Sequence, residues 1–141
     1  MENLWNLNKD IVIESPAEVL RKQADFLSEM TEREVCASVV EKPNRSNGFS
    51  YDFIINSPLL PNYSYKVFSI ECAPTLYPLK IACVYDLASE LKDAEYFGTN
   101  IGVTCNNMSE YKEKIKEILS TDYMSQVVAA VKSMVNTSLP F

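Results

Sequence analysis

The sequence predicts an α+β fold: an antiparallel four- to five-stranded meander with one N-terminal helix and two C-terminal helices packed on it. Three observations predict it. Apolar residues recur at helical spacing after residue 15, alternate with period two between residues 35 and 85, and return to helical spacing after residue 107. The chain has 141 residues, the length of one domain, and no linker or repeat divides it. We therefore expect a single domain over 1–141.

The first helix is predicted to begin at Pro16 and to end near Thr31. Ser15 can cap it, Pro16 suits the first helical position, and Glu18 stands at the capping-box position. Two sets of residues then recur at steps of three and four: Val19, Gln23, Phe26 and Met30, and Leu20, Ala24 and Leu27. Because the apolar stripe is wide, we expect this helix to pack on a sheet.

Four consecutive strands are predicted between Val35 and Tyr85, separated by turn-forming stretches at 43–48 and 57–62 and by the prolines Pro74 and Pro78. Short connections between successive strands make an antiparallel meander. The third and fourth strands are apolar on both faces, so either helices cover more than one face or a second copy of the chain does.

The C-terminal half is predicted to hold one more strand and two helices. A short strand is expected around Ile101 and Val103, although Gly98 and Gly102 weaken its pattern. One helix follows a capping box that begins at Asn107. A final helix follows a cap at residue 121 or 122 and presents an apolar face of valines.

Charge and hydropathy limit the classes of binding partner and the cellular compartment that we expect. The chain carries 13 Lys and Arg against 19 Asp and Glu, a formal charge of −6, which argues against nucleic acid as a partner. It would instead suit a basic protein. No stretch approaches the roughly 20 apolar residues of a membrane span. The run 11–13 is too short for a signal-peptide core. We therefore expect a cytoplasmic protein that binds no membrane.

The residue types offer little chemistry. Histidine is absent, and with it the commonest general base and metal ligand. The four cysteines, widely spaced, are expected to be buried thiols; they are Cys36, Cys72, Cys83 and Cys105. The acidic stretch 86–95 is expected to be a solvated connector, and 98–102 a turn. We expect no enzyme, cofactor, metal ligand or catalytic residue, with a carboxylate pair assembled in space left open.

The tyrosines are the candidate binding residues. The chain has 8 of them, and tyrosine combines a large ring with a polar tip, which suits recognition surfaces. With strict alternation, Tyr63, Tyr65 and Val67 share the face of the third strand opposite to Phe68 and Ile70. We predict a contact surface at Tyr63, Tyr65 and Val67, with packing under a helix as the alternative.

Three stretches carry a resemblance: 16–31 (PAEVLRKQADFLSEMT), 53–68 (FIINSPLLPNYSYKVF) with Tyr77-Pro78, and 115–128 (IKEILSTDYMSQVV). Together they resemble small single-domain bacterial proteins of uncharacterised function. The resemblance implies a bacterial cytosolic protein and transfers no catalytic residue.

From these observations we expect a non-enzymatic protein-interaction module that self-associates as a homo-oligomer. One form of it is an immunity-like or antitoxin-like protein that masks a basic partner, since small size and acidity suit that role. The alternative is a small-molecule-binding protein with a pocket between a curved sheet and a helix.

Overall fold

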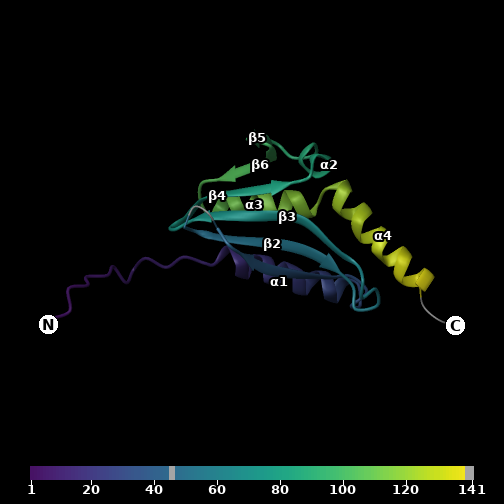
Figure 1. The fold of residues 1–141 in the computed structure, drawn as a ribbon, viewed down its shortest axis with the longest axis horizontal. Coiled ribbons are helices and arrows are strands. Elements are labelled where there is room, and N and C mark those ends of the chain that lie inside the picture. The colour runs from purple at the N-terminus through teal and green to yellow at the C-terminus, as the bar shows by residue number, and fades with distance from the viewer. Residues whose placement is uncertain (45–46, 139–141) are drawn as a thin grey trace.

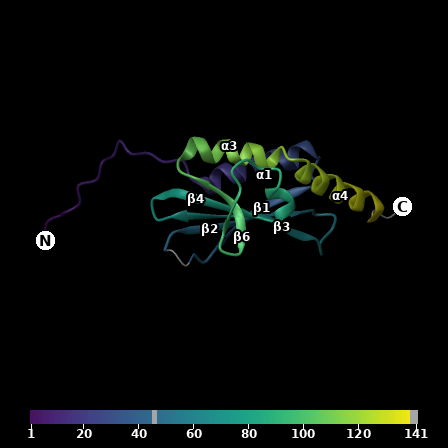
Figure 2. The same ribbon diagram turned by 90° about the horizontal axis from the view of Figure 1, so that it is seen from above.

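The computed structural model describes residues 1–44 and 47–138, so Arg45 and Ser46 of the predicted turn at 43–48 lie outside the described residues. One antiparallel sheet has the strand order β1-β2-β3-β4-β6-β5, with α1, α3 and α4 on one face (Figures 1 and 2). The strands are β1 (Cys36–Lys42), β2 (Phe49–Asn56), β3 (Ser64–Ala73), β4 (Leu76–Cys83), β5 (Glu95–Phe97) and β6 (Asn100–Cys105). The helices are α1 (Pro16–Met30), α2 (Tyr85–Ala88), α3 (Met108–Leu119) and α4 (Asp122–Ser138).

The predicted α+β fold is confirmed, with six strands instead of four or five. The additional strand is β5, which is only three residues long and forms a hairpin with β6 at the edge of the sheet. A strand this short has no alternation for a sequence pattern to display. Among the described residues, no helix is long and apolar enough to cross a membrane.

The ends of α1 follow local capping chemistry. The Ser15 hydroxyl accepts the backbone N–H of Glu18 at 3.4 Å, as predicted, whereas the Glu18 carboxylate turns outward to Arg21 at 2.7 Å. At the other end, the buried hydroxyl of Thr31 accepts the N–H of Val35 at 3.1 Å. This bond holds the tight connection that carries the chain from α1 into the sheet.

A β-bulge in β3 decides which side chains face the helices. The register pairs Phe53 with Phe68, and then pairs Ile55 with Tyr65, so β3 uses one residue more than β2 over this interval. Phe53 and Ile55 are two residues apart and share a face, and their partners Phe68 and Tyr65 therefore share it too. The prediction that Tyr65 lies opposite to Phe68 is wrong, because Val67 is the additional residue in the bulge. Both apolar sets of β3 thus face the helices.

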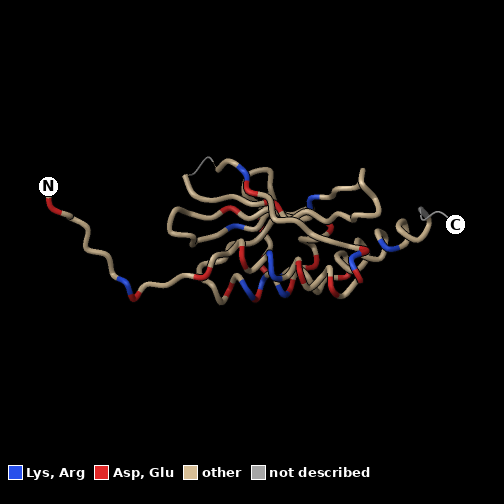
Figure 3. Tube along the Cα trace, turned by 90° about the horizontal axis from the view of Figure 1, so that it is seen from below, with Lys and Arg blue, Asp and Glu red and all other residues tan. Residues whose placement is uncertain are grey.

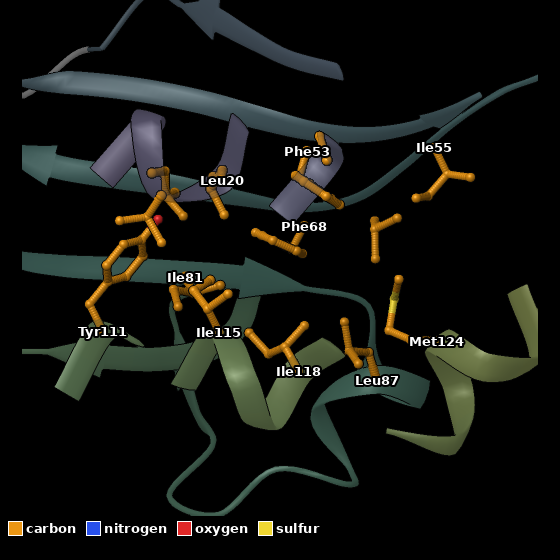
Figure 4. Close-up of a cluster of buried hydrophobic side chains, with 14 of the residues drawn as sticks. Leu20, Phe53, Ile55, Phe68, Ile81, Leu87, Tyr111, Ile115, Ile118 and Met124 are labelled. Atoms are coloured by element: carbon orange, nitrogen blue, oxygen red, sulfur yellow. The ribbon is translucent and has the colours of Figure 1, made fainter. Parts of the chain in front are cut away.

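The core lies between this face of the sheet and the helices (Figure 4). The rings of Phe53 and Phe68 stack with their centroids 4.9 Å apart, at the centre of the layer. Tyr111 of α3 is fully buried, and its hydroxyl donates to the carbonyl of Pro16 at 2.8 Å. That bond ties α3 to the first turn of α1 across the core.

The start of α4 is held by two caps. Thr121 accepts the N–H of Met124 at 3.2 Å, and the Glu90 carboxylate accepts the N–H groups of Asp122 and Tyr123, both at 2.8 Å. A carboxylate at a helix N-terminus satisfies open donors and complements the helix dipole. From this anchored start, α4 runs outward past the end of the sheet (Figure 1).

Candidate functional site

The tyrosine site predicted from the sequence lies under the helix layer. Val67 is 1% exposed and belongs to the core, while Tyr63 and Tyr65 are half-buried and pack against it. The Tyr65 hydroxyl forms a hydrogen bond with the hydroxyl of Tyr123 in α4. Burial, and then this bond, raise the pKa of Tyr123 to about 12. The structure therefore gives these side chains a packing role, joining β3 to α4.

A groove runs between the helices on the helix-covered side of the sheet. Its first half is a hollow of about 540 Å³ between α1 and α3. Its second half is a hollow of about 470 Å³ between α1 and α4. Gln23 and Leu119 line both hollows, so the two halves adjoin. We call them the basic half and the apolar half of the helix groove.

The apolar half opens directly over the core. Its floor is formed by Phe53 and Ile55 of β2, which are otherwise buried. On its α1 wall, Phe26 is 54% exposed and Met30 is 80% exposed. Val128 of α4 lines the opposite side. Exposed apolar surface that continues into a hollow is typical of an interaction site in a folded protein.

The basic half lies at the mouth of the groove, where the chain enters α1. Lys22, Lys112 and Lys116 line it together with Glu14. The Glu14 carboxylate lies 2.7 Å from the Lys112 ammonium and 3.9 Å from that of Lys22. The hydrogen bond from Lys112 lowers the pKa of Glu14. These exposed ion pairs lie where the preceding segment joins α1.

That segment, residues 1–13, is an arm that leaves the body and runs away from the sheet (Figure 1). Its large apolar side chains are exposed, with Leu4 at 77%, Trp5 at 78% and Leu7 at 68%. The hydrogen bonds that the structure gives to residues 1–13 are all internal to the arm. The chain therefore exposes an apolar segment and an apolar groove at the same time.

The helix-free face of the sheet holds a hollow of about 790 Å³. Its buried carboxylate, Asp52, accepts the Ser69 hydroxyl at 2.7 Å and pairs with Lys42 at 3.2 Å. The Lys80 ammonium lies 5.0 Å from the ring centroid of Phe97. These groups are partnered within the chain, as is typical of the solvated face of an antiparallel sheet.

The buried thiols are poor nucleophiles. Burial raises the pKa values of Cys72, Cys83 and Cys105 to about 11, so these side chains stay protonated near neutral pH, and a protonated thiol attacks slowly. Cys72 and Cys105 are buried, whereas Cys83 and the fourth cysteine, Cys36, are half-buried; the Cys36 sulfur lies 3.7 Å from the Ser28 hydroxyl. Within the part of the chain that the structure describes, no group of His, Cys, Asp and Glu is arranged to hold a metal.

The raised thiol pKa values predict alkaline destabilisation. Between pH 9 and 11 an unfolded thiol ionises while the same thiol in the fold keeps its proton, so the free energy of unfolding falls as pH rises. Each fully buried thiol contributes a slope of about 1 kcal/mol per pH unit. Urea unfolding across this range measures the slope, and Cys105→Ala should make it shallower. An unfolding free energy independent of pH would contradict the burial of these thiols.

No protein-family model, curated protein or solved structure matches the chain. The site must therefore be argued from its geometry. Sequence patterns alone do not identify the helix groove, because Phe26 and Met30 fall in the apolar stripe that predicts the core face of α1. The one local signal was the arm, where Leu4, Trp5 and Leu7 precede the first helix with no structure of their own to bury them.

Proposed function

We propose that this chain is a non-enzymatic protein-interaction module that self-associates, with a second copy of the chain occupying the helix groove. One observation carries the proposal. The apolar half leaves the core residues Phe53 and Ile55 lining an open hollow, with Phe26 and Met30 exposed beside it. Burying such surface against a partner is favourable in proportion to the apolar area removed from water.

A second copy is the occupant because the chain exposes both halves of a contact. The arm presents Leu4, Trp5 and Leu7, and the groove presents an apolar hollow. In a two-fold dimer the arm of each copy contacts the groove of the other. Both arms and both grooves are then buried, and no contact surface is left for a third copy.

Charge favours this partner over a basic protein. Although the chain has a formal charge of −6, acidic and basic residues interleave along the helices that border the groove (Figure 3). If the chain were an immunity-like or antitoxin-like protein that binds a basic partner, we would expect a continuous acidic surface to attract that partner. The groove instead has three lysines and Glu14 at one end, and mainly apolar side chains with Lys132 at the other.

Two features support a non-enzymatic role. The sequence has no histidine, the commonest general base, and the pKa values of three thiols are raised to about 11, which makes these thiols poor nucleophiles. The ligand-pocket alternative would use the same apolar half, which lies between β2 and the helices, and not the hollow on the helix-free face of the sheet.

The test compares two substitutions on α4. Ala129 and Ala130 are neighbouring exposed alanines, of which Ala129 lines the groove and Ala130 does not. Light scattering after gel filtration, at about 1 to 100 µM protein, should give the unmodified chain a mass twice its 16.0 kDa. Ala129→Glu should yield a monomer because it places a charge in the apolar half. Ala130→Glu should remain a dimer.

Two outcomes would contradict the proposal. If the unmodified chain stays at 16.0 kDa across the whole concentration range, it does not self-associate. If Ala129→Glu and Ala130→Glu dimerise equally, the contact lies outside the helix groove. Circular dichroism of both variants confirms that the fold is intact before either outcome is read.

A further inference from the structure

Resting on the proposed self-association, we infer that two copies exchange N-terminal arms, and that Leu4, Trp5 and Leu7 of each copy fill the apolar half of the other's helix groove. The inference assigns a specific segment of the chain to the groove. It depends on where the arm begins, in which direction it runs and how much apolar surface it carries.

The arm has a defined turn and a stiff base. The N–H of Ile11 donates to the carbonyl of Asn8 at 3.3 Å, and the N–H of Asp10 donates to the Asn8 side chain at 3.0 Å. Asparagine at this position is typical of such turns. Between this turn and Glu14 lie Val12 and Ile13, two β-branched residues, which favour extended backbone.

This geometry keeps the arm out of its own apolar half. The arm leaves α1 at Ser15 and continues away from the body, in the direction opposite to the course of α1 (Figure 1). Phe26 and Met30 lie about 16 and 22 Å further along α1, at 1.5 Å per residue. With the arm in this direction, the apolar half open to it is that of another molecule.

The area is sufficient for a stable dimer. Leu4, Trp5 and Leu7 together would bury on the order of 400 Å² in one groove. Counting the groove surface and both copies, the total is on the order of 1,500 Å², which is the size of a standard specific interface. The half of the groove that receives them measures about 470 Å³, space for side chains of this size.

Trp5 provides a direct readout because it is the chain's one tryptophan. On dilution of the unmodified protein, the fluorescence emission maximum of Trp5 should shift to longer wavelength in parallel with the fall in mass from dimer to monomer. Quenching by acrylamide should increase over the same concentration range, since the indole passes from a buried site into water.

A mixing experiment identifies the groove and the arm together. The first chain carries Ala129→Glu, so its groove is blocked while its arm and Trp5 are intact. The second carries Leu4→Ser, Trp5→Ser and Leu7→Ser, so it lacks tryptophan but keeps an open groove. Each should be monomeric alone. Adding an excess of the second chain should shift the emission of Trp5 in the first to shorter wavelength. The matched control is the second chain with Ala129→Glu added, which should produce no shift.

The outcomes separate this inference from the proposed function. A shift with the open groove and none with the blocked groove supports arm exchange. If the serine variant still dimerises and mixing gives no shift, the arm is not the occupant, although self-association through another surface stands. A monomer with a buried Trp5 at every concentration places the arm in its own groove and overturns the inference. A monomer with a solvated Trp5 overturns the proposed function as well.

Discussion

Replacing Gly102 with alanine is expected to destabilise the sheet by about 4 kcal/mol or more, because overpacking against backbone cannot be relieved by a rotamer change. Gly102 of β6 pairs with Ala82 of β4, and a Cβ at this position would lie 1.7 Å from the carbonyl oxygen of Ile81. The carbonyl carbon of Ile81 would be 2.7 Å away. Both atoms belong to the backbone of a central strand, so β6 would have to separate from β4.

Urea unfolding measures this loss, and Gly98 provides the matched control. Gly98→Ala makes the same chemical change in the β5–β6 hairpin, where the added Cβ meets nothing within 4 Å. Its cost is about 1 kcal/mol, from the left-handed backbone at φ +65°. Equal unfolding midpoints for the two variants would mean that β6 does not approach β4 as closely as the structure describes.

The elements that depend on local chemistry could be predicted from the sequence. Ser15 caps α1, Asn107 caps α3 by accepting the Glu110 N–H at 2.9 Å, and Thr121 caps the start of α4. Each cap is a side chain within three residues of its donor, so the signal is complete in a short stretch of sequence. The strands of the meander were predicted for the same reason, since alternation is a local pattern.

The bulge at Val67 could not be predicted in this way. Strict alternation places Tyr65 and Phe68 on opposite faces of β3, and the pairing with β2 places them on one face. Which residue forms a bulge depends on the neighbouring strand and on the side chains that cover the sheet. The apolar pattern on both faces of the third strand, for which the sequence left open a covering helix or a second copy, is explained by this bulge within a single chain.

The helix groove also could not be predicted, because it depends on how α4 is placed relative to α1. Phe26 and Met30 have the spacing of core residues and are exposed because α4 runs past the end of the sheet instead of covering them. Glu90 caps α4 from a connector more than thirty residues away in sequence. No local sequence pattern determines the direction of α4. Self-association could therefore be expected from the sequence, but the helix groove could not be predicted as the contact surface.

Introducing a charge at Tyr65 is expected to destabilise the fold, which distinguishes packing from a contact surface. Tyr65 is half-buried beside its cross-strand partner Ile55, and its hydroxyl bonds to that of Tyr123. Tyr65→Glu would place a carboxylate between β3 and α4, at a cost of about 3 kcal/mol in the free energy of unfolding. Tyr65→Phe keeps the ring and loses the hydrogen bond alone, for about 1 kcal/mol.

The decisive comparison is between stability and association in the same two variants. If Tyr65 joins β3 to α4, Tyr65→Glu lowers the urea midpoint strongly, Tyr65→Phe lowers it slightly, and Tyr65→Phe dimerises like the unmodified chain. If Tyr63, Tyr65 and Val67 formed a contact surface, Tyr65→Glu would keep the midpoint and lose the dimer. Val67 at 1% exposure and the bond from Tyr65 to α4 favour the first result. A Tyr65→Glu chain that is both stable and monomeric would move the interface from the helix groove to β3.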